Sequence, residues 1–156
     1  MYVIYHCVGG THSSAIASAI HLGMLPDNRV ASREEILSIP YFDTLTKKEY
    51  GRIIFRGVDE YGNYIYTLSR QFYPHIVIPS LEDLCTILTG DTSILMLVDM
   101  ASAINIIMKI GGFMSRRLGI VSIGRPLVIA GTQRAYMDIV KIVHQTKQSI
   151  ETRMEF

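Results

Sequence analysis

The sequence predicts a single α/β domain in three layers, with a mostly parallel, P-loop-like or Rossmann-like sheet and one β-hairpin. Short β-rich runs alternate with helical patterns along the 156 residues, which is typical of parallel strands joined by crossover helices. The composition is unusually apolar, with 49% hydrophobic and 19% charged residues, as expected for strands buried on both faces. Because no linker or repeat interrupts the pattern, residues 1–149 are expected to form one domain and residues 150–156 a C-terminal tail.

The first strand and the first helix are predicted on either side of a glycine pair. Residues 3–7 are apolar and β-rich, and residues 13–22 show a helical pattern rich in alanine and isoleucine. Gly23 follows where a C-terminal helix cap is expected. Gly9 and Gly10 lie between the two elements, so the strand passes into the helix through a glycine turn.

Two capping boxes and a hairpin are predicted in the next segment. The Ser/Thr-x-x-Glu spacing at residues 32–35 and 46–49 predicts a short helix as far as about residue 38 and then another helical turn or two. Residues 52–58 and 64–68 are β-rich, and the Asp-Glu-Tyr-Gly-Asn turn between them predicts an antiparallel pair at the edge of the sheet.

A strand–helix rhythm is predicted for the second half of the chain. Strands are expected at three apolar runs, residues 75–78, 94–98 and 127–130. A helix is expected to follow each of them, and these helices end near residues 88, 118 and 148. Together with the first strand, these runs give about four parallel strands.

The glycine turn has the character of an anion site. A strand, glycines and a helix N-terminus in this order bring unpaired amides and the helix dipole to one point. A phosphate or a nucleotide is the ligand that such a turn would hold. The predicted binding residues are Gly9, Gly10, Thr11, His12 and Ser13.

The P-loop motif itself is not matched. With Ser13 at the hydroxyl position, His12 stands where the lysine belongs, and Thr11 and His6 stand where the two glycines belong. A tight turn with Ser13 or Thr11 as a helix cap explains the same residues. Without the lysine, a degenerate kinase or NTPase relative that binds a phosphate-bearing small molecule is a better prediction than one that turns it over.

Further positions complete the predicted nucleotide site. Asp99 directly follows an apolar strand, so it would hold Mg²⁺ opposite Ser13, or it would simply cap the next helix. Gly131 and Thr132 follow the last predicted strand, which would bring a second helix N-terminus to the same cleft. The arginines at 116–117 could close over such a site or end a helix.

Two alternatives from other functional classes stay open. Cys7 begins a Cys-x5-Ser run that resembles a phosphatase loop, although His12 stands where such a loop carries arginine. The missing arginine removes a bidentate clamp on the phosphoryl oxygens, and Cys7 could instead be an inert buried thiol. In the second alternative the domain is non-catalytic, and its apolar surplus forms a homo-oligomer or partner interface.

Charge and hydropathy exclude other classes. The net charge of +1 gives no electrostatic case for nucleic acid. The longest apolar stretch, residues 94–110, contains Asp99, Asn105 and Lys109 and is not expected to span a membrane, although mean hydropathy is +0.26. The N-terminus lacks a basic leader and the two cysteines form no CxxC pair, so a cytoplasmic protein with reduced thiols is expected.

Five motifs taken together carry a family resemblance. They are the run at residues 6–14, the hairpin turn at 57–63, the Gly-Gly-containing run at 110–117, Gly-Arg-Pro at 124–126 and Gly-Thr at 131–132. Over nearly its whole length the chain resembles a small bacterial family, mostly from Firmicutes, known as domain of unknown function 3189. The resemblance implies a stand-alone cytoplasmic domain of about this length and implies no activity.

Overall fold

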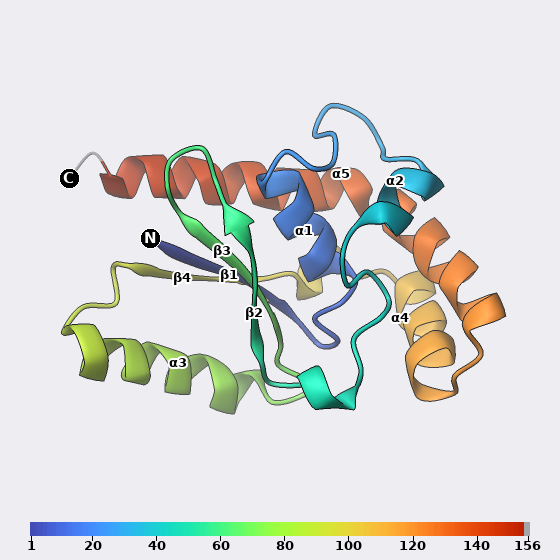
Figure 1. Cartoon of the computed structure of the whole chain (residues 1–156), viewed down its shortest axis with the longest axis horizontal. Helices are drawn as coiled ribbons and strands as arrows, with labels where there is room; N and C mark the ends of the chain where they lie inside the picture. Colours follow the sequence, from blue (N-terminus) through green and yellow to red (C-terminus); the bar gives the residue numbers. More distant parts are fainter. Residues whose placement is uncertain (155–156) are drawn as a thin grey trace.

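The computed structural model describes residues 1–154 and confirms the mixed α/β fold (Figure 1). The strands are β1 (Tyr2–Cys7), β2 (Ile53–Val58), β3 (Tyr64–Ser69) and β4 (Leu95–Asp99). The helices are α1 (Ser13–His21), α2 (Arg33–Ser38), α3 (Pro74–Thr89), α4 (Ile106–Gly112) and α5 (Val121–Met154). Short turns of helix occur at η1 (Lys47–Glu49), η2 (Ala101–Ala103) and the π-helical η3 (Phe113–Arg117).

The four strands form one sheet in the order β2-β3-β1-β4. β1 is parallel to both of its neighbours, β3 and β4, and β2 pairs antiparallel with β3 as the predicted hairpin. The chain leaves β1 on the β3 side and later returns past β1 to β4. The boundary between β1 and β4 is therefore a topological switch point, where open α/β sheets commonly bind ligands beyond the carboxyl ends of the strands.

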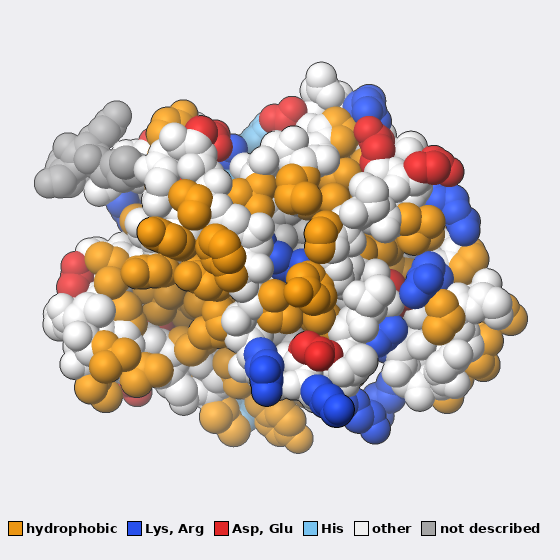
Figure 2. Space-filling model, in the orientation of Figure 1, with side chains coloured by type: hydrophobic (Ala, Val, Ile, Leu, Met, Phe, Trp, Pro, Cys, Tyr) orange, Lys and Arg blue, Asp and Glu red, His pale blue; other side chains and the backbone are white. Residues whose placement is uncertain are grey.

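The two faces of the sheet differ in how they are covered. Helices α1 and α5 lie over one face, where Val3, Tyr5 and Cys7 of β1 join the buried core. On the other side α3 runs alongside β4 without burying any of its own residues (Figure 1). Hydrophobic side chains consequently gather at the surface over α3 and the hairpin strands (Figure 2). We name this surface the open face, and its exposed members include Tyr2, Phe55, Tyr64, Leu84, Ile87 and Leu88.

The first half of the chain follows the predictions closely. The strand at 3–7, the helix at 13–22 and the hairpin are confirmed with end shifts of one residue. Both capping boxes are formed, so that the Ser32 and Glu35 side chains each bond the other residue's backbone amide. The strand expected at 94–98 is also present, as β4.

Two predicted strands are wrong. Residues 75–78 form the first turns of α3, which starts at Pro74, and residues 127–130 lie inside α5 after Pro126. Pro74 occupies the first turn of α3, where proline is favoured because its missing N–H has no partner there anyway, whereas Pro126 lies inside α5. Periodicity cannot distinguish a strand from a helical segment in an apolar run of only four residues.

Helix lengths differ from the prediction at the C-terminal side. The helix expected to reach residue 118 is divided into α4 and η3. α5 continues through the predicted tail as far as Met154, and Ile150 is buried, while residues 155–156 lie outside the described part. Within residues 1–154, no helix is both long enough and apolar enough to cross a bilayer.

Candidate functional site

A cavity of about 330 Å³ opens beyond the carboxyl ends of the three parallel strands. Its walls come from the segments that follow β1, β3 and β4, so it lies at the topological switch point. Of the residues predicted from the glycine turn, Gly9, Thr11, His12 and Ser13 line it. Four of the five residues predicted from the glycine turn therefore line one cavity, and their binding role stays a prediction.

Gly10 shapes the loop from behind the cavity. Its φ is +66°, a left-handed conformation that glycine adopts without strain. A Cβ atom added there would lie 2.7 Å from the backbone nitrogen of Ser69 in β3. Any side chain at this position would push the loop away from the sheet, so Gly10 positions the site without lining it.

Several hydrogen-bond donors are free at the start of α1. The first bond within the helix runs from the Ile16 amide to the His12 carbonyl, so the amides of Ser13, Ser14 and Ala15 have no acceptor in the helix. The Ser13 hydroxyl is fully buried, lines the cavity and has no hydrogen-bond partner among the described residues. A buried unpaired hydroxyl costs free energy, which a bound acceptor would recover.

Lys109, Arg116 and Arg117 of α4 and η3 form a cationic wall on one side of the cavity, and no carboxylate within residues 1–154 lines it. Lys109 and Arg117 are exposed at the cavity, and in that range neither forms an ion pair. Arg116 instead donates to the backbone carbonyls of Asp43 and Leu45. The resulting positive field favours an anionic ligand.

His12 is held by a buried carboxylate. Its Nε2 lies 3.1 Å from Oδ1 of Asp43, whose side chain is fully buried. Asp43 also accepts hydrogen bonds from Ser115 Oγ at 2.7 Å and Arg125 Nε at 3.0 Å. Burial alone would raise the pKa of Asp43, but the hydrogen bonds from His12, Ser115 and Arg125 outweigh it and hold the pKa below its usual value.

Thr11 connects the glycine turn to the loop that carries Asp43. Its hydroxyl donates to the Tyr41 carbonyl and accepts from the Thr44 amide, while its carbonyl accepts from the Asp43 amide. Tyr41 and Asp43 both have positive φ, at 65° and 50°. The hydroxyl of Thr11 therefore supports the wall of the cavity.

Three glycines fix the position of the cationic wall. A Cβ atom at Gly111, Gly124 or Gly131 would lie within 2.4–2.7 Å of an atom of the facing segment. We name this close contact between α4–η3 and α5 the glycine seam. It allows the two backbones to touch and so holds Lys109 and Arg117 beside the first turn of α1.

The prediction that Gly131 and Thr132 begin a second helix at the site is wrong. Both residues lie in the interior of α5, because residues 127–130 are helical. Gly131 belongs to the glycine seam, and its carbonyl accepts a hydrogen bond from Asn105. Thr132 is fully buried and does not line the cavity.

Asp99 lies at the end of β4 but outside the cavity lining. Its carboxylate accepts from Arg70 at 3.1 and 3.2 Å and from the Ala101 amide at 2.9 Å. The structure thus does not bring Asp99 and Ser13 into one site, and the Mg²⁺ role of Asp99 stays a prediction. No group of three His, Cys, Asp or Glu side chains suited to a metal occurs in the described range.

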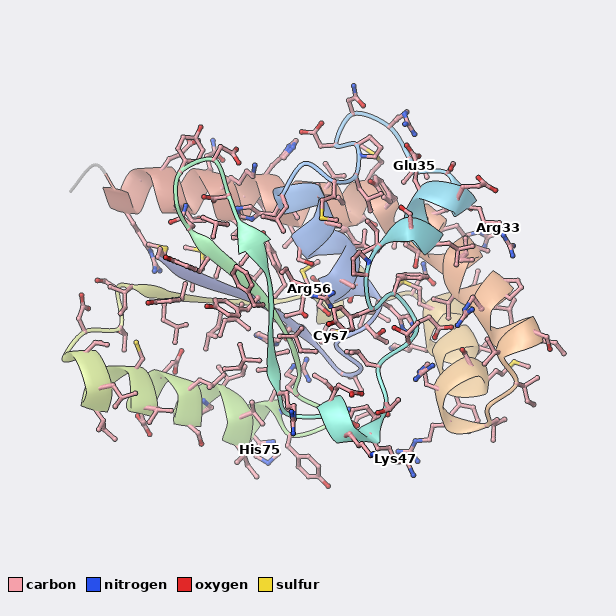
Figure 3. The ribbon with its side chains drawn as sticks, in the orientation of Figure 1. Cys7, Arg33, Glu35, Lys47, Arg56 and His75 are labelled. Carbon is pink, nitrogen blue, oxygen red and sulfur yellow. The ribbon has the colours of Figure 1, made fainter. Side chains whose placement is uncertain are left out.

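Cys7 lies at the end of β1 close to the first turn of α1 and lines the cavity (Figure 3). The Gly10 amide donates to its Sγ at 3.1 Å, and Ser14 Oγ is 3.3 Å from the same sulfur. Both partners of the sulfur come from the glycine turn and the start of α1. The thiol is thus integrated into the candidate anion site.

Two important residues of the site were not predicted. Asp43 lies 31 positions from His12 in a loop without a motif, and Lys109 lies in an apolar helix. The only sequence signal for Lys109 is that a charged residue interrupts an otherwise apolar run. Asp43 carries no comparable signal, since only folding brings it to His12.

A family model described as Protein of unknown function (DUF3189) matches residues 2–148 and confirms the family resemblance. No curated protein matches the chain, and no solved structure matches it either.

Proposed function

The chain belongs to the DUF3189 family, and we propose that it binds a phosphate-bearing small molecule in the cavity beyond β1. One observation carries this proposal. The Ser13 hydroxyl is buried without a partner at the N-terminus of α1, inside a lining that contains cations and no carboxylate among the described residues. A phosphate dianion accepts hydrogen bonds from donors of this kind, namely amides at a helix N-terminus, a hydroxyl and flexible cations.

The rest of the cavity favours an organic phosphate over the free ion. Tyr50, Phe72 and Phe113 line it together with aliphatic side chains. Aromatic and aliphatic walls bury an apolar group, while a few polar groups fix its orientation. A phosphate ester with an apolar or aromatic part therefore fits best, and a nucleotide with Mg²⁺ stays a narrower prediction within that class.

Titration calorimetry on the full chain would test this proposal. We expect inorganic phosphate to bind, phenyl phosphate to bind more tightly, and the Lys109→Ala/Arg117→Ala variant to bind at least about tenfold more weakly. Ser13→Ala should also weaken binding. ATP with and without Mg²⁺ decides the nucleotide prediction.

Arg33→Ala and Lys141→Ala are matched controls, because both cations are exposed and neither lines the cavity. They should bind like the wild type. Equal affinity in the Lys109/Arg117 variant and the controls, or no binding of either phosphate, would refute the proposal.

A second function, self-association, is favoured by the open face. Tyr2, Phe55 and Tyr64 are 44–52% exposed and form an aromatic cluster with ring centroids 5.5–6.4 Å apart. Together with Ile53 and the exposed apolar side chains of α3, they make an apolar surface of the kind that marks a protein–protein interface, to which each partner typically contributes about 800 Å². We propose a second copy of this chain as the occupant.

Sedimentation velocity across a concentration series would test self-association. The wild type should form a dimer, and Phe55→Ser/Leu88→Ser should shift it to monomer. Ile123→Ser is the matched control, because Ile123 is about as exposed as Phe55 but lies on α5. A wild type that stays monomeric at high concentration would contradict the proposal.

A further inference from the structure

We propose that Cys7 is a nucleophile, so that the cavity hydrolyses phosphate monoesters through a cysteinyl-phosphate intermediate. This inference rests on the proposed phosphate binding and adds a reaction to it.

The environment of Cys7 places hydrogen-bond donors at its sulfur. The Gly10 amide at 3.1 Å and the Ser14 hydroxyl at 3.3 Å can both donate to the sulfur. The sulfur also lies at the N-terminal end of α1, whose dipole stabilises negative charge. The thiolate is the form of a cysteine that attacks, and these donors would stabilise it and the sulfur as a leaving group in the second step.

The donors around Cys7 are free to receive a phosphoryl group. The buried Ser13 hydroxyl has no partner in the described range, and the amides of the first turn of α1 have no acceptor in the helix. Lys109 and Arg117 would neutralise the phosphoryl oxygens from the other side of the cavity. The site therefore offers both a nucleophile and charge stabilisation.

His12 is placed to exchange the proton. Its Nε2 is engaged by Asp43, which leaves Nδ1 as the free ring nitrogen. Nδ1 lies 3.4 Å from the position of a Cβ on Gly112, a residue that lines the cavity and has no side chain to cover the ring. The ring is thus oriented by a buried carboxylate and open toward the ligand.

The reaction is balanced in two steps. In the first, an Sγ–P bond forms, the ester P–O bond breaks, and the Nδ1–H of His12 protonates the departing alcohol oxygen. In the second, water attacks phosphorus, the Sγ–P bond breaks to restore the thiolate, and His12 takes the proton from water. The products are the alcohol and inorganic phosphate.

Hydrolysis of p-nitrophenyl phosphate by the full chain is the principal test. Cys7→Ser should lose hydrolysis while still binding inorganic phosphate by calorimetry. Cys85→Ser is the matched control, since Cys85 is the other free cysteine and lies on α3, and it should keep full activity. Hydrolysis that persists in Cys7→Ser, or phosphate binding by a wild type without hydrolysis, would overturn the nucleophile and leave the binding proposal intact.

Two further measurements do not depend on the folding of Cys7→Ser. Iodoacetamide should alkylate Cys7 of the wild type, and inorganic phosphate should protect it. His12→Asn should slow phenyl phosphate hydrolysis at least about tenfold more than p-nitrophenyl phosphate hydrolysis, because the poorer leaving group needs the proton. Unprotected labelling, or equal loss with both esters, would count against the proposal.

Discussion

Two His–Asp pairs with buried carboxylates lie at opposite ends of α1, and the histidine of one of them, His12, lines the cavity. His12 Nε2 lies 3.1 Å from Asp43 at the start of the helix, and His21 Nε2 lies 3.0 Å from Asp59 at its end. Both carboxylates are almost completely buried. The two pairs are therefore similar in composition and in distance.

They differ in what the second ring nitrogen contacts. Nδ1 of His21 is bonded to the Tyr5 hydroxyl at 2.7 Å, so both nitrogens of that ring are occupied. Asp59 also accepts from the Tyr61 and Asn63 amides and so holds the hairpin turn. A buried His–Asp pair of this kind stabilises the fold, and chemistry requires a ring nitrogen that stays free at a cavity.

We name His21–Asp59, whose two ring nitrogens are both hydrogen-bonded, the sealed pair, and the largest expected effect is on its stability. Asp59→Ala removes the acceptor for His21, Tyr61 and Asn63, so the free energy of unfolding should fall by about 3–5 kcal/mol. Urea unfolding measures the loss. Phosphate affinity of the folded fraction should not change, because Asp59 does not line the cavity. Weaker phosphate binding by Asp59→Ala would contradict the view that the His21–Asp59 pair serves stability alone.

The pair at the cavity should affect both properties. Asp43→Asn should lower the free energy of unfolding by about 1–3 kcal/mol, since Ser115 and Arg125 lose a charged acceptor. It should also weaken phosphate binding several-fold, because His12 and the cationic wall lose their support. Asp59→Asn is the control and should lower stability alone; equal affinity in the two variants would show that Asp43 does not position the site.

The sealed pair should also make stability depend on pH. Burial lowers the pKa of His21, and its hydrogen bond to Asp59 only partly opposes this. As the pH falls, His21 is therefore protonated at a higher pH in the unfolded chain than in the folded one. Protonation then favours the unfolded chain, so the free energy of unfolding falls as the pH drops below about 6.5. His21→Gln should reduce this slope between pH 6.5 and 5 in urea unfolding. Part of the slope remains, because burial also lowers the pKa of His6.

The smallest effect is expected at a third, exposed pair. His144 Nε2 lies 3.1 Å from Asp27, and both side chains are more than half exposed. Asp27→Asn should change the free energy of unfolding by less than about 1 kcal/mol and leave phosphate affinity unchanged. A larger loss of stability would mean that burial is not what separates these pairs.

The sequence predicted local features of the fold better than long-range ones. The β1–α1 turn, the hairpin and the capping boxes depend on neighbouring residues, and they were found where expected. The runs at 75–78 and 127–130 were assigned to strands because each is short, apolar and followed by a helical pattern. Their helical state depends on tertiary packing, which includes the glycine seam for the second.

The candidate site shows the same limit. The glycine turn was predicted because its residues are contiguous, whereas the partnership of His12 with Asp43 arises only when a distant loop folds back. Likewise, Asp99 follows an apolar strand as a Walker-B acid does, yet Arg70 engages it outside the cavity. Sequence order gives the strand end and leaves the contacts of its side chain undetermined.

The glycine seam also sets how mutations are tolerated along this chain. At Gly111, Gly124 and Gly131 the smallest possible change, one methyl group, would separate α4 and η3 from α5 and move the cationic wall. Large changes at exposed positions such as Ile123 touch none of these contacts. In a saturation mutagenesis of the gene, even alanine should therefore be strongly damaging at the three seam glycines, whereas alanine should be mild at exposed positions such as Ile123.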